Sequence, residues 1–287
     1  MIHPRQLFSL TLPDHRTLQL GARTLVMGIV NVTPDSFADG GERFAPEAAI
    51  AGALEMARAG ADLIDIGAES TRPGADPLPP EEELRRLVPV LAGLQGRLDV
   101  PIAVDTYKAE VAERAIDLGA AIVNDISGLT FDPGLAAVVA RRRVPVVLMH
   151  TRGRSKDMYG RATYADPAGE VAAELSARIE AAEAAGIPRT QVVVDPGLGF
   201  AKRAEHSFAV LADLPRLAAL GCPVLVGPSR KSFLTAALGD VPPDQRRWGT
   251  AAAVTAAVLL GAHIVRVHDV GEMVEVVRVA DAIRGSV

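Results

Sequence analysis

Eight short apolar runs recur along this chain, and each stops at or close to a polar residue. The runs cover residues 24–30, 62–64, 101–104, 121–123, 144–149, 191–194, 223–226 and 264–267. They are nearly all apolar and rich in β-branched residues, as parallel strands covered on both faces must be. Alanine-rich stretches of helical length separate them. This alternation is typical of an α/β protein folded as a single (β/α)₈ TIM barrel, whose active site lies at the carboxyl ends of the strands.

The helices can be placed from their lengths and from glycine stop signals. Gly60, Gly119 and Gly261 each stand between a helical stretch and the next apolar run, where a left-handed residue commonly ends a helix. The expected helices are 45–59, 80–95, 107–118, 133–142, 168–185, 206–220 and 271–284, with two more around 230–238 and 245–260. Two loops after strands, 31–44 and 67–80, are long and rich in Gly, Pro and polar residues, so we expect them to be functional.

The pattern predicts one domain. Residues 24–287 are expected to form the barrel, after a short N-terminal extension, residues 1–23, that carries a short strand or hairpin. The alternative fold is a doubly wound open sheet. That fold requires a glycine-rich phosphate fingerprint after the first strand, and Gly28-Ile29-Val30-Asn31 does not supply one.

Composition narrows the classes of partner. The formal net charge is −5, without the broad basic field that nucleic-acid binding requires, so no nucleic acid is expected. Cys222 is the single cysteine, which excludes an internal disulfide and suits a reducing compartment. No charged-then-apolar leader opens the chain, and charges interrupt its long apolar segments. We therefore expect a cytoplasmic protein that does not enter a membrane.

Three acidic or amide side chains close neighbouring apolar runs. Asp105 and Asp195 each end one run, and Asn124 ends another between them. Carboxylates at the rim of a barrel can accept paired N–H bonds from a nitrogen heterocycle, and an amide can both donate and accept. The alternative is that each residue caps a helix or satisfies loop backbone. For three such residues on one rim, ligand binding is the better explanation.

Basic side chains follow the last two runs. Lys231 comes after the seventh run, while Arg266 and His268 straddle the end of the eighth. Loops at this place in barrels often bind phosphate, and Arg72 on the second long loop can join from across the mouth. The alternative for Arg230 is a surface ion pair that contributes little, and the alternative for His268 is a rim histidine satisfied by its neighbours. We therefore predict an anion site at this edge.

A dedicated metal cage is poorly supported. The six histidines show no paired helical spacing, and one cysteine cannot build a zinc cluster. Mg²⁺ is the better candidate because it takes oxygen ligands, keeps several waters and bridges substrate phosphates. Asn31 and Asp35 are the candidates that lie nearest the expected phosphate site.

Seven segments together resemble the dihydropteroate synthases, the folate-pathway enzymes targeted by sulfonamides. The first two are Gly28-Ile29-Val30-Asn31-Val32-Thr33-Pro34-Asp35-Ser36-Phe37 and Asp65-Ile66-Gly67-Ala68-Glu69-Ser70-Thr71-Arg72-Pro73-Gly74. The others are Val104-Asp105-Thr106, Asn124-Asp125-Ile126-Ser127-Gly128, Asp195-Pro196-Gly197-Leu198-Gly199-Phe200, Ser229-Arg230-Lys231 and Arg266-Val267-His268-Asp269. They follow the order of that family from about residue 24 to the C-terminus.

The resemblance implies a reaction and a set of roles. 6-Hydroxymethyl-7,8-dihydropterin diphosphate and 4-aminobenzoate would give 7,8-dihydropteroate and diphosphate. Polar strand-end residues would hold the pterin: Asp105, Asn124, Asp195 and Lys231. Met149 and Phe200 would be its apolar walls. Asp105 and Asp35 would stabilise positive charge on the reacting methylene, and Lys231 would stand between the substrates.

The other substrate groups are assigned in the same way. Asn31 would ligate Mg²⁺, and the diphosphate would be held by Arg72, Arg266 and His268. The aminobenzoate would be bordered by Thr71, Pro73, Phe200 and Ser232. Its carboxylate would sit at the helix N-terminus after Lys231. Resemblance also implies a homodimer that packs through helices of the C-terminal half.

Two alternative functions would use the same polar pterin-binding residues. A methyltransferase barrel would bind a methylated folate and would need no diphosphate site. A diphosphate site is favoured here by four basic residues: Arg72, Lys231, Arg266 and His268. A catalytically silent pterin-binding paralogue would lack a loop or magnesium residue, yet Asn31, Asp35, Thr71 and Arg72 are present. The chain departs from many family members at Ala68, Ala201 and Ser207. His150 has no assigned role.

Overall fold

The eight apolar runs form the parallel strands of a barrel. The computed structural model describes residues 2–33, 45–72 and 74–286. Its barrel strands are β3 Leu25–Asn31, β4 Leu63–Gly67, β5 Ile102–Asp105, β6 Ala120–Asp125, β7 Val146–Met149, β8 Val192–Asp195, β9 Leu225–Val226 and β10 Ile264–Val267. Their order is β8-β7-β6-β5-β4-β3-β10-β9, and a parallel bridge between Val194 and Val224 joins the two ends. The predicted (β/α)₈ barrel is confirmed.

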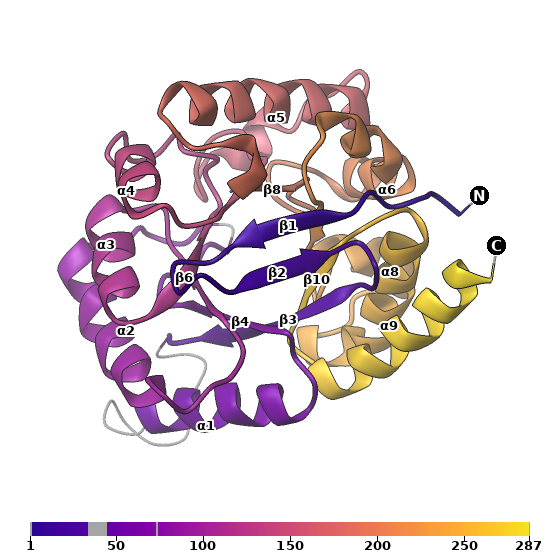
Figure 1. The fold of residues 1–287 in the computed structure, drawn as a ribbon. Coiled ribbons are helices and arrows are strands. Elements are labelled where there is room, and N and C mark those ends of the chain that lie inside the picture. Colours follow the sequence, from indigo (N-terminus) through magenta and orange to yellow (C-terminus); the bar gives the residue numbers. More distant parts are fainter. Residues whose placement is uncertain (1, 34–44, 73, 287) are drawn as a thin grey trace.

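Helices surround the strands as a ring (Figure 1). They are α1 Ala45–Arg58, α2 Pro80–Leu94, α3 Ala109–Asp117, α4 Leu135–Arg142, α5 Pro167–Ala184, α6 Ala204–Ala212, α7 Thr235–Leu238, α8 Arg247–Leu259 and α9 Val270–Gly285. Short 3₁₀ turns are η2 Met158–Arg161, η3 Arg189–Gln191, η4 Leu214–Leu220, η5 Ser232–Leu234 and η6 Pro243–Arg246. Aliphatic side chains from the helices and the outward faces of the strands form one continuous buried core. The barrel therefore provides a rigid frame for residues at the strand ends.

One expected helix is divided. The apolar pattern predicts a single helix over 206–220, but α6 ends at Ala212 and the 3₁₀ turn η4 begins at Leu214. Pro215 lacks a backbone N–H and disfavours the α conformation at the residue before it. The α-helical hydrogen bonds therefore cannot continue across this point.

An antiparallel hairpin covers the amino ends of the strands. β1 Phe8–Thr11 and β2 Thr17–Leu20 pair within the N-terminal extension, and Figure 1 shows them lying across the barrel in this view. Leu10 and Leu20 of the hairpin are buried against residues from the interior of the barrel, such as Leu63 and Leu225. The amino end of the barrel is closed by apolar packing, which leaves the carboxyl end for chemistry.

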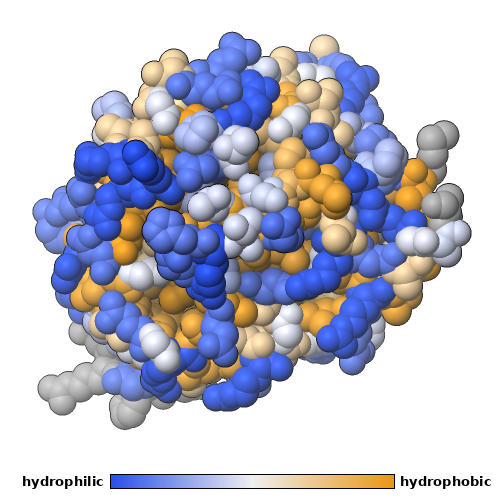
Figure 2. All heavy atoms as spheres, in the orientation of Figure 1, coloured by the Kyte–Doolittle hydropathy of each residue, from blue (hydrophilic) through white to orange (hydrophobic). Residues whose placement is uncertain are grey.

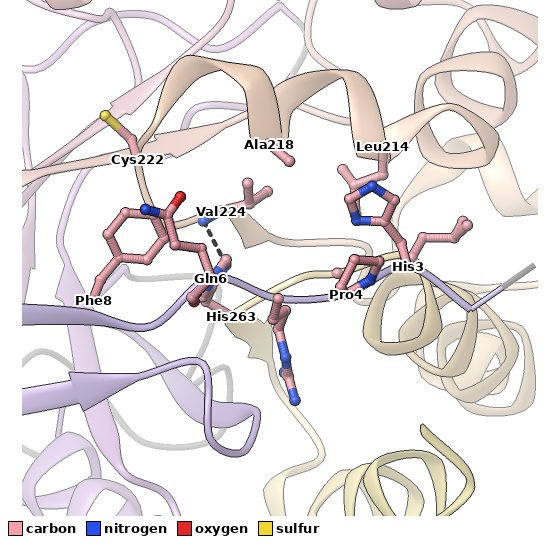
Figure 3. A pocket seen from close by; sticks show the side chains of 12 residues that line it. His3, Pro4, Gln6, Phe8, Leu214, Ala218, Cys222, Val224 and His263 are labelled. Atoms are coloured by element: carbon pink, nitrogen blue, oxygen red, sulfur yellow. Dashed lines mark hydrogen bonds between the residues drawn. The ribbon is translucent and has the colours of Figure 1, made fainter. Parts of the chain in front are cut away.

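The surface at the hairpin end shows no large apolar field. Hydrophilic residues cover most of the face in Figure 2, with hydrophobic residues visible in small areas between them. A cavity of about 20 Å³ lies between the N-terminal extension and η4, among His3, Leu214 and Cys222 (Figure 3). This volume holds about one water molecule, which is too little for a substrate. Within the described ranges, no helix is long and apolar enough to cross a membrane.

Candidate active site

The strand register brings the predicted acidic residues to one level of the rim. Gly67 pairs with Asp105, Asp105 pairs with Asn124, and Met149 pairs with Asp195. Neighbouring parallel strands lie about 4.8 Å apart, so Asp105 and Asn124 are direct neighbours. Each residue ends or nearly ends its strand because the next residues must turn outward toward a helix.

Arg266 links two carboxylates at the centre of this rim. Its Nε donates to Oδ2 of Asp65 at 2.6 Å, and its Nη2 donates to Oδ2 of Asp105 at 2.7 Å. Asn124 Nδ2 also donates to Oδ2 of Asp65 at 3.0 Å. A planar guanidinium suits this bridging geometry. We call Asp65, Asp105, Asn124 and Arg266 the floor cluster.

The charges of the floor cluster are strongly coupled to burial. Burial raises the pKa of Asp105 to about 7, because the attraction of Arg266 only partly offsets desolvation and the repulsion of Asp65. Burial also opposes the charge on Arg266, but Asp65 and Asp105 outweigh it and raise the guanidinium pKa. Asp65 Oδ1 has no hydrogen-bond partner within the part of the chain that the structure describes. The cluster thus retains unused acceptor capacity, as recognition of N–H groups requires.

Lys231 and Asp195 form the adjacent side of the site. Lys231 Nζ donates to the carbonyl of Leu198 and lies 4.5 Å from the ring centroid of Phe200. Burial lowers the pKa of Lys231 to about 8, although the charge of Asp195 raises it. Burial also raises the pKa of Asp195, whose Oδ1 accepts from the backbone N–H of Gly197 at 2.7 Å. A weakly held proton on Lys231 and a buried carboxylate are suited to a polar heterocycle.

Apolar side chains flank these polar groups. Met149 is buried in a small cluster with Tyr107 and Ile126, and Phe131 and Phe200 pack against it half-buried. Its position at the carboxyl end of β7 comes from the register with Asp195. The arrangement offers flat apolar faces next to hydrogen-bonding groups, as a ring-shaped ligand requires.

His268 is a neutral side chain at the edge of the site near Arg266 and Arg72, which we call the basic edge. Its backbone N–H donates to Ser229 Oγ at 3.1 Å, so the Ser229 hydroxyl can donate to His268 Nδ1 at 3.0 Å. The imidazole proton then sits on Nε2, which acts as a hydrogen-bond donor. Burial, followed by the charges of Arg266 and Arg230, lowers the pKa of His268 to about 3. The imidazole of His268 is therefore neutral, and the cationic charge here comes from arginine.

The remaining predicted residues border this floor or lie outside the described part. Arg72 is exposed, and its charge contributes to the lowered pKa of His268, which places it near the basic edge. Thr71 and Asn31 are half-buried, and Ser232 is exposed where η5 begins. The helix expected after Lys231 is only this 3₁₀ turn continued by the short α7. Asp35 and Pro73 lie outside the described residues.

Sequence reasoning missed a clamp behind the second long loop. Lys108 Nζ binds Glu69 and Glu83, and Tyr107 donates to Glu69 Oε1 at 2.9 Å. Glu69 Oε2 also accepts from the backbone N–H of Leu78 at 3.2 Å, so one carboxylate joins both ends of the loop. The signal available in the sequence was Glu69 followed in the next unit by Tyr107-Lys108, a pattern too general to assign a role.

Asp65 was also left without a role. It lies inside β4 between Ile64 and Ile66 and is fully buried. A carboxylate inside an apolar strand is costly without a partner, so it signals one elsewhere in the fold. The sequence alone does not identify that partner as Arg266.

Three residues at which the chain departs from many family members lie in or next to the loops around the site. Ala201 adopts a left-handed φ of 48° and is buried, and its carbonyl accepts from the Tyr164 hydroxyl at 3.0 Å. Ser207 Oγ accepts from the Gly199 N–H at 3.1 Å. Ala68 is buried, and its carbonyl accepts from Arg86. These residues shape the loops of the site and contact no group of the floor cluster.

The oxygen donors fit Mg²⁺ only if a ligand supplies the rest. Among the described residues no group of three His, Cys, Asp or Glu side chains can hold a metal ion. Asn31 ends β3 beside Gly67 and offers one amide oxygen at the rim. Mg²⁺ is commonly held by one or two protein oxygens together with phosphates and waters. The donor set is compatible with that mode of binding.

Comparisons with known proteins agree with this geometry. The sequence profile of the pterin binding enzyme family matches residues 27–268. A dihydropteroate synthase of Synechocystis sp. is 48% identical over 273 residues, which is 95% of this chain and 94% of that protein. A Xanthomonas albilineans dihydropteroate synthase solved with 4-aminobenzoic acid has a TM-score of 0.90 and 46% identity, covering 97% of this chain and 99% of that one.

A second Xanthomonas albilineans structure, solved with 7,8-dihydropteroate, has a TM-score of 0.86 and 44% identity over 96% of this chain and 98% of that one. The family profile spans the barrel from β3 to the residue after β10, including the floor cluster. The chain belongs to the pterin binding enzymes and, within them, to the dihydropteroate synthases.

Proposed function

We propose that this enzyme joins 6-hydroxymethyl-7,8-dihydropterin diphosphate to 4-aminobenzoate with the residue roles given below. The amine nitrogen forms a bond to the pterin methylene carbon as that carbon's bond to oxygen breaks. Diphosphate leaves with the electron pair, and the proton lost by the amine passes to the departing diphosphate or to solvent. The observation that supports this proposal most directly is the floor cluster, with buried acceptors on one side and cationic groups at its edge.

The floor cluster and its neighbours are assigned to the pterin. Asp105 and Asp195 accept from ring N–H groups, Asn124 donates and accepts, and Lys231 donates. Met149 and Phe200 enclose the ring, since both are apolar and adjoin these polar groups. An ionised Asp105 also lies where positive charge on the methylene carbon is stabilised. Asp35 would share that role.

The basic edge is assigned to the diphosphate. Arg72 supplies positive charge, and His268 supplies a neutral N–H donor. Arg266 is already bound to Asp65 and Asp105. It therefore acts on the leaving diphosphate through its positive electrostatic field rather than through a direct hydrogen bond. Asn31, with Asp35 close to it in sequence, would hold Mg²⁺, which when bound would neutralise charge on the leaving diphosphate.

The aminobenzoate is assigned to the outer part of the mouth. Thr71 and Pro73 come from the second long loop, and Ser232 begins the turn after Lys231. Phe200 separates this position from the pterin. An arylamine is already a nucleophile, so no general base is assigned. The loops 31–44 and 67–80 would exclude water from the reacting carbon.

We also propose a homodimer in the cytoplasm. Phe208 on α6, Leu238 on α7 and Trp248 on α8 are large and apolar, and they are 37%, 41% and 77% exposed. α6 contacts α8, and both lie on one side of the barrel (Figure 1). Exposed large apolar side chains on neighbouring helices, with a tryptophan among them, are typical of a protein interface. The single, buried Cys222 suits a reducing compartment.

The decisive assay measures products. Purified enzyme with both substrates and Mg²⁺ should release diphosphate and form dihydropteroate in equal amounts. Dihydropteroate without diphosphate, or neither product alongside an active control enzyme, would contradict the proposal. Binding of the pterin diphosphate without turnover would indicate a silent paralogue. Methyl transfer from a methylated folate to a corrinoid would indicate the methyltransferase alternative.

A further inference from the structure

A buried polar network lies behind the Phe200 wall. His150 and Lys202 are only 3% and 1% exposed. Lys202 contacts His150, His150 contacts Glu174 of α5, and Glu174 pairs with Arg152 from the loop after β7. We call these four residues the His150 network. None of them belongs to the floor cluster, and the proposed mechanism uses none of them.

Lys202 has three hydrogen-bond acceptors around its amine. Nζ lies 2.7 Å from His150 Nδ1, 3.2 Å from the Gly197 carbonyl and 3.1 Å from the Phe200 carbonyl. An ammonium has three donors and no acceptor, so this number of partners matches its capacity. Burial lowers the pKa of Lys202 well below its ordinary value, while the charge of Asp195 raises it. Through its hydrogen bonds to the carbonyls of Gly197 and Phe200, Lys202 holds the turn that contains Phe200 in place.

Glu174 sets the proton position on His150. His150 Nε2 lies 3.0 Å from Glu174 Oε2, so this nitrogen carries the proton and leaves Nδ1 to accept from Lys202. Burial, reinforced by Lys202, lowers the pKa of His150 to about 4, which keeps the imidazole neutral. Arg152 Nε donates to Glu174 Oε1 at 3.0 Å and fixes the carboxylate in turn.

A second branch reaches the same turn. The Arg152 guanidinium lies 4.0 Å from the ring centroid of Tyr164, whose hydroxyl donates to the Ala201 carbonyl. Both branches from Arg152 therefore end on adjacent carbonyls, those of Phe200 and Ala201. The turn also runs close to the residue after β7, because a Cβ at Gly197 would lie 2.0 Å from the His150 carbonyl oxygen and only glycine fits there.

The turn controls two groups of the site. Its Leu198 carbonyl accepts from Lys231 Nζ, and the Phe200 ring lies next to that ammonium. Lys202 and Lys231 thus hold the same short segment through different carbonyls. Any movement of the segment changes both the apolar wall and the cation between the substrates.

We propose that Lys202, oriented through His150 and Glu174, is a positioning residue that sets Phe200 and Lys231 for both substrates. The proposal rests on the proposed function, since it names the residues that hold the substrate wall in place. Lys202 touches neither substrate. It acts by fixing the turn 197–200, so its loss weakens substrate binding and leaves the chemical step largely intact.

The test compares Lys202→Met with wild type. Methionine keeps most of the stem and removes the donors. The Kd for the pterin diphosphate substrate, measured by calorimetry in the absence of the arylamine, should rise about tenfold, as loss of uniform binding predicts. The KM for the arylamine substrate should rise similarly, while kcat changes by less than about threefold. Unchanged Kd and KM would overturn the proposal.

Arg5→Met is the matched control, because Arg5 is another buried cation, bound to Asp281 at the opposite end of the barrel. Arg5→Met should lower stability without altering Kd or KM. An equal loss of affinity in Arg5→Met would show that general destabilisation explains both variants.

Glu174→Ala removes a partly exposed side chain and serves if Lys202→Met does not fold. It should raise both Kd and KM, and Glu174→Gln should restore them. Wild-type affinity in Glu174→Ala would also contradict the proposal. If wild type binds pterin diphosphate without turnover, the proposed reaction fails, while the Kd comparison still tests this inference.

Discussion

Two carboxylates share one guanidinium on the floor of the barrel. Asp65 and Asp105 would repel each other without Arg266, which donates to both. Removing one member of a buried charge group leaves the others uncompensated, and the cost is then larger than the value of the single contact. In the proposed mechanism the charge on Asp105 therefore serves both the floor cluster and the substrate.

Asp105→Asn should reduce kcat/KM by roughly two to three orders of magnitude, since an amide neither stabilises positive charge nor accepts from two N–H groups equally well. Product formation under steady-state conditions measures the effect, and thermal unfolding checks the fold. Asp62→Asn is the control, because Asp62 pairs with Arg23 at the amino end of β4 and should leave turnover unchanged. Wild-type turnover in Asp105→Asn would remove Asp105 from the mechanism.

The pH profile of kcat/KM should be a narrow bell. Asp105, with a pKa raised to about 7, must be ionised, so activity falls as the pH drops below that value. Lys231, with a pKa lowered to about 8, must be protonated, so activity falls as the pH rises above that value. The profile of kcat/KM reports these groups in the free enzyme.

Two variants assign the limbs. Asp105→Asn should flatten the acid limb, and Lys231→Met should flatten the alkaline limb while lowering activity throughout. Titration of the substrate diphosphate would survive in both variants, so it can be recognised. An acid limb that persists unchanged in Asp105→Asn would contradict the assignment.

Strand ends were predictable because chemistry and topology coincide there. Asp105, Asn124 and Asp195 each close an apolar run, and parallel strands bring such ends together whatever their separation in sequence. Asp65 and Lys202 were not predictable, since their partners come from distant units and no spacing rule connects them. The neutral state of His268 depends on burial, which a sequence does not report.

At the scale of elements, most strands and helices followed from apolar spacing. The strongest cases are β3 and β8, where an apolar segment ends at a polar residue, Asn31 and Asp195. The division of 206–220 was missed because the periodicity continues through Pro215 while the backbone hydrogen bonds cannot. Length is decided by hydrogen bonding as well as by the apolar pattern.

The hairpin β1–β2 should stabilise the barrel without contributing to catalysis. Leu10 is buried against the barrel interior at the end opposite the floor cluster. Leu10→Ala should lower the free energy of unfolding by about 2–5 kcal/mol, measured by urea denaturation, and leave kcat/KM of the folded enzyme unchanged. Leu7→Ala, at a position 70% exposed, should change it by less than about 0.5 kcal/mol. A large fall in kcat/KM for Leu10→Ala would show that the two ends of the barrel are coupled.

For the whole molecule, closure of the barrel separates stability from chemistry. The bridge between Val194 and Val224 joins β8 to the segment that leads into β9, so the strand ends form a ring rather than an open edge. A ring lets groups from β4, β5, β6 and β10 converge on the floor cluster. The sequence predicted this closure from the count of eight units, but the identity of the central cation required the three-dimensional arrangement.

The proposed dimer gives a prediction for the assembled molecule. Trp248, at 77% exposed, is the most exposed of the large apolar side chains that the described residues contain, and it lies on α8, which contacts the helix α6 that carries Phe208. Wild-type enzyme should sediment as a dimer, and Trp248→Glu should shift it to monomer at micromolar concentration, since a charge at the centre of an apolar interface is desolvated without a partner. Val279→Glu, on α9 and 63% exposed, should remain dimeric. Dissociation by Val279→Glu instead would place the interface on α9, and a monomeric wild type would reject the dimer.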